Sequence, residues 1–142
     1  GVLNEDNSID ILRTKELIAI SKPLSFTFHR AFDCAENPKK ALLELIDMGI
    51  DRVLTSGLEE KAENGIELLI DLQEIAKDNL IILPASGINQ KNVHLFKKVG
   101  FKEIHSSASK IIKSSSVFFD KTPQTVSDIE TIEDILKVIK NA

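Results

Sequence analysis

The chain lacks several residue types, and each absence argues against a class of protein. Tryptophan and tyrosine are absent from its 142 residues, so the sequence offers little of the aromatic platform on which single-stranded nucleic acids stack. Its single cysteine, Cys34, excludes an internal disulfide framework and a thiolate-rich metal site, and fits a reducing compartment such as the cytoplasm. No apolar run is long enough to span a bilayer.

The charge pattern is equally unspecialised. Acidic and basic residues are interspersed, with a formal net charge of −4, so there is no basic stripe for nucleic acid and no cationic amphipathic face for a membrane. Hydrophobic content of 42% and charged content of 28% are ordinary for a globular domain with its own core. We therefore expect a cytoplasmic protein that binds a small molecule or a metal ion, but neither nucleic acid nor membrane.

Predicted strands and helices alternate along the chain. Strands are predicted at 24–28, 52–55, 80–83 and 102–105, and helices at 14–21, 38–48, 66–76, 93–99 and 128–139, with an irregular Ser-rich stretch over 106–126. Strand centres about 25 residues apart with a helix between them are typical of βα units with parallel strands. The pattern predicts one α/β domain over residues 1–142, either part of a (β/α)₈ barrel or a small doubly wound sheet. No predicted strand is followed by the GxGxxG fingerprint of dinucleotide-binding sheets.

Ionisable side chains appear abruptly where the first predicted strand ends. His29, Arg30 and Asp33 follow the apolar run 24–28, and ligands in α/β proteins bind at the carboxyl ends of strands. These three residue types can carry proton transfer, anion binding or metal ligation. The alternative is an Arg30–Asp33 pair that caps the next helix, with His29 a satisfied core residue.

Alternation within the strands extends this candidate site. If the phenylalanines of the first strand pack on helices, an inward face is expected to carry Thr27, His29, Thr55, Glu103 and His105. Unpaired ionisable groups are costly to bury, so we expect a catalytic set of His29, Asp33, Glu103 and His105. In it His29, Glu103 or His105 would transfer protons, and Asp33 would orient Arg30 or His29. The alternative is a Glu–His pair that satisfies itself.

Small residues follow three of the predicted strands. They are Ser56-Gly57, Ser86-Gly87 and Ser106-Ser107, and small residues let backbone N–H groups approach a ligand closely. Loops after the last two strands of (β/α)₈ barrels often hold a phosphate in this way, although small residues are also ordinary turn formers. We therefore predict an anion pocket formed by these residues together with Arg30 and Thr55.

These motifs resemble the CutC family. The matching segments are Thr27–Asp33, Asn37-Pro38 with Ala41-Leu42, Arg52–Gly57, Ala62 with Gly65, and Ile104–Ala108, in the family's order and spacing over nearly the whole chain. The resemblance implies a (β/α)₈ barrel of which this chain holds about strands five to eight. The opening Gly1–Leu3 looks like the end of strand four, so we expect a fragment or split product without the N-terminal strands.

The resemblance also implies a role in copper homeostasis, with copper ion binding and copper as the cofactor. Cu(I) prefers thiolate and thioether ligands, and this chain offers only Cys34 and Met48, beside the imidazoles of His29 and His105. Cysteines proposed as copper ligands lie in the family's first strands, which this chain lacks. The metal-ligating residues are therefore left unassigned.

The sequence and the resemblance together give two functional hypotheses and a third, purely structural one. The first is the handling of copper, and the second is an enzyme or binding protein for a small anionic metabolite that carries phosphate or carboxylate. In place of the family's three glycines, Ala85-Ser86-Gly87 leaves less room for backbone approach to an anion. The structural reading is a partial barrel without activity of its own. Its open edges predict a homo-oligomer or association with the missing N-terminal half.

Overall fold

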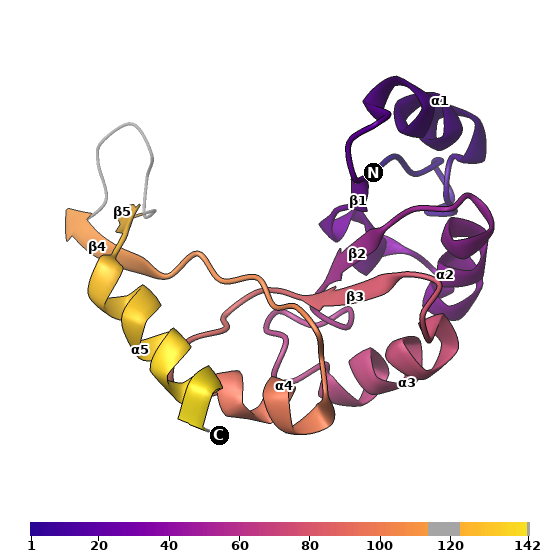
Figure 1. Ribbon diagram of the computed structural model, residues 1–142. Coiled ribbons are helices and arrows are strands. Elements are labelled where there is room, and N and C mark those ends of the chain that lie inside the picture. The colour runs from indigo at the N-terminus through magenta and orange to yellow at the C-terminus, as the bar shows by residue number, and fades with distance from the viewer. Residues whose placement is uncertain (114–122, 142) are drawn as a thin grey trace.

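The structure, a computed structural model, describes residues 1–113 and 123–141. Figure 1 shows its elements in chain order: α1 (Ile11–Ser21), β1 (Thr27–Phe28), the 3₁₀ helix η1 (Arg30–Cys34), α2 (Pro38–Asp47), β2 (Arg52–Thr55), α3 (Ile66–Ala76), β3 (Ile81–Pro84), α4 (Val93–Val99), β4 (Ser109–Lys113), β5 (Gln124–Ser127) and α5 (Ile129–Asn141). None of the helices in these residues is both long and apolar enough to cross a membrane.

Three parallel strands form the central sheet, in the order β1-β2-β3. Phe28 lies beside Val53, and Val53 beside Ile82. Helices connect successive strands, as parallel pairing requires. The predicted α/β fold with a parallel sheet is therefore confirmed.

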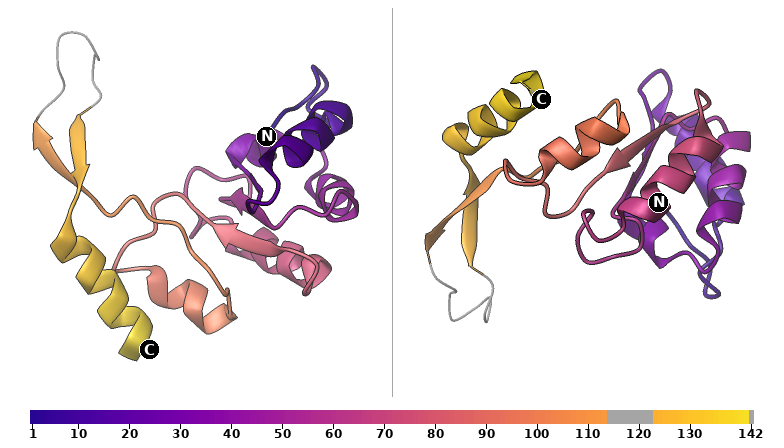
Figure 2. Two further views of the ribbon diagram at one scale, coloured as in Figure 1. Left: turned by 45° about the horizontal axis from the view of Figure 1, so that its top comes forward. Right: turned by 90° about the horizontal axis from the view of Figure 1, so that it is seen from below.

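One face of the sheet is buried under helices. Phe28, Val53 and Ile82 share that face and are at most 3% exposed. The helices α2, α3 and α4 follow one another over it (Figure 2), and they bury Leu42, Leu45, Leu69, Leu72 and Phe96 in the same core. The other face, which carries Arg52, Leu54, Ile81 and Leu83, is half-buried. It is the uncovered face of the described sheet.

Most helix boundaries follow from capping residues in the sequence. The Asn37 side chain accepts a hydrogen bond from the Lys40 N–H at 3.0 Å at the start of α2, where Pro38 is the first helical residue. The Asp128 carboxylate accepts one from the Thr131 N–H at 3.0 Å at the start of α5. Gly100 ends α4 in the left-handed conformation, with φ of 90°. The helices predicted over 38–48, 66–76, 93–99 and 128–139 are confirmed to within two residues.

Two predictions about the C-terminal part are wrong. Residues 102–105 do not form a strand. This segment makes a single backbone hydrogen bond to β3, from the His105 N–H to the Pro84 carbonyl at 2.9 Å. The stretch 106–126 is not wholly irregular, because it contains the antiparallel pair β4–β5, although 114–122 lies outside the described residues. The Ser-rich composition concealed the apolar pair Ile111-Ile112, which β4 leaves exposed.

The predicted inward face also needs correction. The register pairs Thr27 with Arg52, and Phe28 with Val53. Thr55 is two residues beyond Val53 and therefore shares the face of Phe28, not that of Thr27. It is fully buried, on the side covered by helices.

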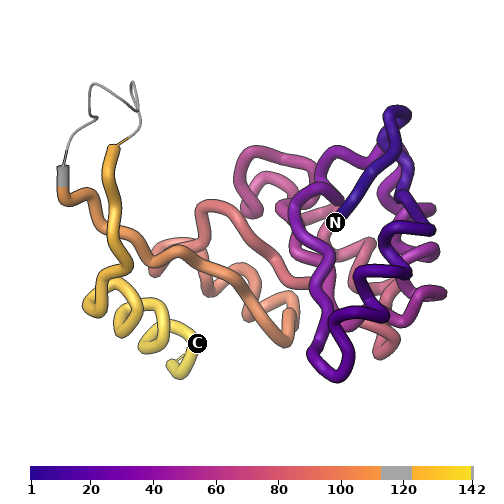
Figure 3. The backbone as a smooth tube through the Cα atoms, turned by 90° about the horizontal axis from the view of Figure 1, so that it is seen from above, coloured from indigo at the N-terminus to yellow at the C-terminus, as the bar shows by residue number. Residues whose placement is uncertain are grey.

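The molecule is elongated and curved. Figure 3 shows α5 and the β4–β5 hairpin at one end and α1 at the other, with the sheet between them. The C-terminal helix α5 lies against α4 and away from the sheet (Figure 1).

A pair of neighbouring leucines on α2 tests the assignment of the core. Leu45 is fully buried and Leu43 is 53% exposed. We expect Leu45→Ala to lower the free energy of unfolding by about 2–5 kcal/mol, because it removes buried methyl groups and leaves a cavity. Leu43→Ala, the matched control, should change it by less than about 0.5 kcal/mol. Urea denaturation measures both, and equal effects would contradict the packing described.

Candidate functional site

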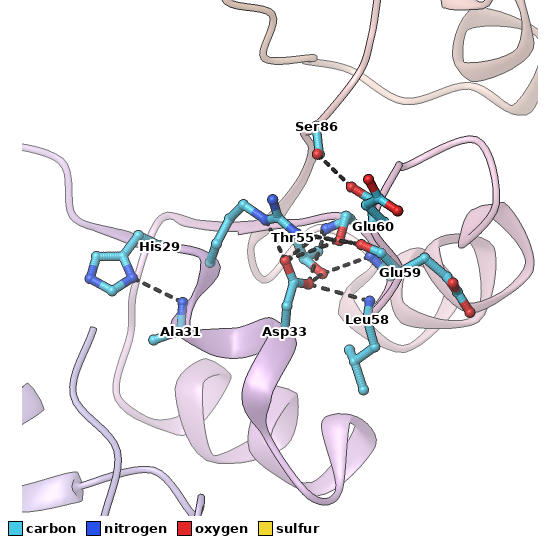
Figure 4. A network of polar contacts seen from close by, with 11 residues as sticks. His29, Ala31, Asp33, Thr55, Leu58, Glu59, Glu60 and Ser86 are labelled. Carbon is cyan, nitrogen blue, oxygen red and sulfur yellow. Dashed lines mark hydrogen bonds and ion pairs between the residues drawn. The ribbon is translucent and has the colours of Figure 1, made fainter. Parts of the chain in front are cut away.

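The Asp33 carboxylate joins the end of β1 to the end of β2. Its oxygens accept hydrogen bonds from the Arg30 Nε–H at 2.6 Å, the Thr55 hydroxyl at 2.5 Å, the Ser56 N–H at 3.0 Å and the Leu58 N–H at 3.3 Å. The Asp33 side chain is only 9% exposed. Figure 4 shows these groups converging on the carboxylate. With all of its oxygens engaged, Asp33 positions its neighbours and has no free lone pair directed at a ligand.

Arg30 is fixed from one side by this arrangement. Its Nε bonds Asp33, and its Nη2 donates to the Ser56 hydroxyl at 2.8 Å and, more weakly, to the Glu59 carbonyl at 3.4 Å. Within the described part of the chain, Nη1 makes no hydrogen bond, and the side chain is 43% exposed. The guanidinium therefore presents a fixed outer edge to solvent, which suits recognition of an oxyanion.

The turn after β2 is built to hold these contacts. The Ser56 hydroxyl lies 2.5 Å from the Glu59 carbonyl and 3.1 Å from Asp33, so its single proton donates to the closer oxygen and a lone pair is left for Arg30. Gly57 has φ of +72°, and a Cβ there would collide with the backbone of Gly65. Glycine is thus required at position 57 by close packing, which is a structural reason for the predicted small-residue loop.

His29 lies at the edge of this cluster. It caps η1, because its Nδ1 accepts a hydrogen bond from the Ala31 N–H at 3.0 Å, which puts the proton of the neutral ring on Nε2. The ring is exposed and points away from Asp33 in Figure 4. The alternative of a core histidine is therefore excluded, and an exposed Nε2–H is what His29 offers a ligand.

Glu103 lies in a different environment from the one predicted. It forms a two-pronged ion pair with Arg52, with distances of 2.7 Å and 2.9 Å. Arg52 begins β2 and Thr55 ends it, so this pair lies toward the opposite end of the strand. Hydrogen bonds from Arg52 lower the pKa of Glu103, and the pKa of Arg52 is raised in return. Because Glu103 is ionised and paired, its role is to hold the segment 102–105 against the sheet. It is poorly suited to transfer protons.

Three of the remaining predicted residues lie together in a second cluster. Gly87, Ser106 and Ser107 line a shallow cavity of about 290 Å³ together with Ile88–Gln90, Ala108, Ser109 and Thr131. The Ser106 hydroxyl donates to the Ile88 carbonyl at 2.6 Å, which ties the two loops together. Ser86 belongs to the first cluster, because its hydroxyl donates to the Glu60 carbonyl at 2.7 Å (Figure 4). His105 is exposed and joins neither network of side-chain hydrogen bonds among the described residues.

The potential metal ligands of the described residues do not gather in one place. No group of three or more His, Cys, Asp or Glu side chains within 1–113 and 123–141 is placed to hold a metal ion. Cys34 is exposed at the end of η1, Met48 packs against the core, and His29 precedes η1. At about 2 Å of rise per residue in a 3₁₀ helix, the backbones of His29 and Cys34 lie roughly 10 Å apart.

Sequence reasoning missed two contributors to these contacts. Arg52 is a charged residue inside a strand that the sequence predicts to be buried, and charged residues in such positions are usually paired; its partner, Glu103, lies fifty-one residues away. The Glu59 carbonyl contributes through its backbone, and no residue type could have indicated it.

Comparison with known proteins gives one consistent family. The model of the CutC family matches residues 1–110. A CutC family protein from Edwardsiella ictaluri is 44% identical over 115 residues, covering 81% of this chain and 45% of the relative. One from Pectobacterium atrosepticum is 37% identical over 150 aligned positions, covering the whole chain and 59% of the relative.

A solved structure agrees with these relatives. The protein from Streptococcus agalactiae that bears the name copper homeostasis protein CutC superposes with a TM-score of 0.68 at 27% identity, covering 74% of this chain and 52% of that one. The chain thus spans about half the length of the proteins it matches.

The contacts of Asp33 predict a large loss of stability when they are removed. We expect Asp33→Ala to lower the free energy of unfolding by about 2–3 kcal/mol, because hydrogen bonds to a charged group are lost and buried donors are left unpaired. Asp134→Ala, which removes a half-exposed carboxylate paired with Lys137, should cost less than about 0.5 kcal/mol. Denaturant titration of the two variants compares them directly. A loss no larger than the control's would show that Asp33 does not hold the site together.

The Arg52–Glu103 pair predicts how stability depends on pH. Because the pKa of Glu103 is lowered from its ordinary 4.5 on folding, the unfolded chain binds more protons near that pH. The pair therefore stabilises the fold above about pH 4.5, and its contribution is lost as the pH falls through the folded pKa. Glu103→Gln should flatten the acid limb of a plot of unfolding free energy against pH. Glu74→Gln, on the exposed face of α3, should leave that limb unchanged. An equal change in both variants would show that the Arg52–Glu103 pair does not cause the pH dependence of stability.

Proposed function

Because the chain belongs to the CutC family, we propose that it acts in copper homeostasis, the role named for its Streptococcus agalactiae relative, and that its own site binds a small anion. The site supports the anion better than it supports copper. The observation that carries this part is the guanidinium of Arg30, held by Asp33 and Ser56 with its outer edge exposed. An arginine fixed in this way pays less conformational entropy when a phosphate or carboxylate binds.

The proposed anion is held by short contacts and not by a long-range field. The exposed residues Glu59 and Glu60 lie on the same loop as the partners of Arg30 (Figure 4), and the chain as a whole carries a net charge of −4. Bulk attraction of anions is therefore weak, and affinity depends on charge-assisted bonds from Arg30. The exposed Nε2–H of His29 is a further donor at the same end of the sheet.

Copper ion binding is the second candidate, and the name of the relative favours it. The exposed thiol of Cys34 and the imidazoles of His29 and His105 are the donors that this chain offers. As they do not converge, copper would need further ligands from another part of a CutC-type protein. Copper content of the purified chain, measured after exposure to Cu(I) and removal of excess, separates this candidate from anion binding.

We also propose that the chain forms part of a (β/α)₈ barrel. Three parallel strands with helices on one face, and a half-buried opposite face, support this arrangement. In a barrel the opposite face would point to the axis, and Thr27, Arg52 and Ile81 would line it. The lone Cys34 supports a cytoplasmic location, where thiols stay reduced.

Substitution of Arg30 tests the anion site. We expect Arg30→Ala to weaken phosphate binding at least about tenfold, since a charge-assisted hydrogen bond contributes about 1.5–3 kcal/mol. Lys110→Ala removes an exposed cation near the other cluster and should change the affinity less than about twofold, because exposed charges are screened. Isothermal titration with phosphate at fixed salt measures both. Equal weakening by the two substitutions would indicate diffuse electrostatics and no pocket at Arg30.

A further inference from the structure

The loop after β3 holds a serine in a backbone conformation that favours glycine. Ser86 has φ of +88° and precedes Gly87, with φ of +71°, and left-handed backbone is unfavourable for a residue with a side chain. The Ser86 hydroxyl donates to the Glu60 carbonyl at 2.7 Å, which holds this conformation in place (Figure 4). Ala108, on the other wall of the cavity that Gly87 lines, also has a positive φ, of +44°. Residues held in such conformations gather at ligand-binding sites.

Backbone donors of this loop lie unpaired at the cavity. In the described part of the chain, the N–H groups of Ser86, Gly87 and Ile88 make no hydrogen bond, although the Ser86 carbonyl accepts one from the Ala62 N–H at 3.1 Å. Gly87 and Ile88 both line the cavity of about 290 Å³. Successive backbone N–H groups in a turn form a concavity that binds anions. These three donors are therefore available to an oxyanion.

A lysine lies directly over the same loop. A Cβ added at Gly87 would come within 3.2 Å of the Lys61 Cγ, so the stem of Lys61 runs across the glycine. Within the residues that the structure describes, the Lys61 ammonium forms no ion pair, and the side chain is exposed. Lysine binds phosphate as a point charge. The cavity thus has a cation at its edge that the proposed anion site at Arg30 does not use.

The loop after β2 connects this cavity to Arg30. The Glu59 carbonyl accepts a hydrogen bond from the Arg30 Nη2 at 3.4 Å, and Lys61, two residues later, lies over Gly87. Two residues of extended chain span at most about 7 Å, so with the contacts at each end the Arg30 guanidinium and Gly87 lie within about 15 Å of each other. Both stand at the carboxyl end of the parallel sheet, within reach of one small molecule.

We infer that the anion bound at Arg30 is one end of a longer ligand, whose second anionic group occupies the cavity at Gly87. The backbone N–H groups of the loop and the Lys61 ammonium hold this second group. The ligand is a small metabolite with an anionic group at each end, such as a sugar bisphosphate. This inference rests on the proposed anion binding at Arg30 and adds the class of ligand. A ligand that joins both subsites binds more tightly than either of its ends alone, because its second contact is intramolecular.

The acidic residues of the loop favour an uncharged middle for this ligand. The exposed side chains of Glu59 and Glu60 stand on the loop between the contacts of Arg30 and those of Lys61. Their carboxylates repel a ligand that carries negative charge along its whole length. A carboxylate is an acceptor, so hydroxyl groups in the middle of the ligand would donate to it. A polyhydroxylated carbon chain with a phosphate at each end meets both conditions.

Calorimetric titration at fixed salt tests the inference with three probes: inorganic phosphate, fructose monophosphate and fructose bisphosphate. We expect the bisphosphate to bind at least about tenfold more tightly than the monophosphate. Lys61→Ala should remove most of this advantage and change the affinity for inorganic phosphate less than about twofold, because phosphate alone binds at Arg30. Gly87→Ala, whose Cβ would press on the Lys61 stem, should act in the same way. Lys98→Ala, which removes an exposed cation of α4, is the matched control and should bind all three probes like the wild type.

Two kinds of result overturn the inference. Equal affinities for the bisphosphate and the monophosphate, or an advantage that survives Lys61→Ala, would show that the cavity does not hold a second anionic group. An advantage lost equally in Lys98→Ala would assign it to diffuse charge. The titration of Arg30→Ala with inorganic phosphate judges the proposed function separately. Phosphate binding that depends on Arg30 without any bisphosphate advantage would contradict only the longer ligand, whereas phosphate binding independent of Arg30 would contradict both. Circular dichroism of each variant confirms that it is folded.

Discussion

The hydrogen bonds of the Asp33 carboxylate are the constraint on which the arrangement of the site depends. They join η1, which follows β1, to the last residue of β2 and to the turn beyond it. Because these two segments lie 22 to 25 residues apart in sequence, their relative position is fixed by packing and by this carboxylate. The same contacts orient Arg30. The hydrogen bonds of Asp33 therefore both stabilise the carboxyl end of the sheet and fix the position of the Arg30 guanidinium. An acidic residue in the middle of a candidate site thus acts as a positioning group.

The rest of the molecule divides into a covered and an uncovered side. On the covered side, Phe28, Val53 and Ile82 pack under α2, α3 and α4. On the other side, the Arg52–Glu103 pair spans from β2 to the segment beyond β3 and holds that segment on a half-buried face. Apolar side chains of α5 are exposed at one end, and in the described part of the chain the backbone groups of Glu103 and Ile104 have no backbone hydrogen bond. The chain spans about half the length of the CutC relatives that it matches.

The local sequence predicted most helices and β2 because periodicity and caps are local. Asn37-Pro38, Asp128 and Gly100 mark ends that the structure reproduces. The errors arose where long-range contacts decide. The face of Thr55 depends on its register with β1, and Glu103 found Arg52 fifty-one residues away instead of a histidine. The grouping of Arg30, Asp33, Thr55 and Ser56 was predictable because strand ends of a parallel sheet meet at one edge. The separate location of Ser106 and Ser107 was not, because 102–105 does not join the ladder as a strand.

The phosphate affinity of Asp33→Asn tests the central claim most directly, because the two accounts of Asp33 predict opposite signs. The substitution removes a negative charge beside Arg30, so if Asp33 merely competes for the guanidinium, phosphate should bind more tightly. If Asp33 positions Arg30, as its contacts indicate, the guanidinium loses its fixed orientation and phosphate should bind more weakly, by roughly tenfold. Titration calorimetry at fixed salt and pH, on protein shown to be folded, gives the answer. Unchanged or tighter binding would contradict the account.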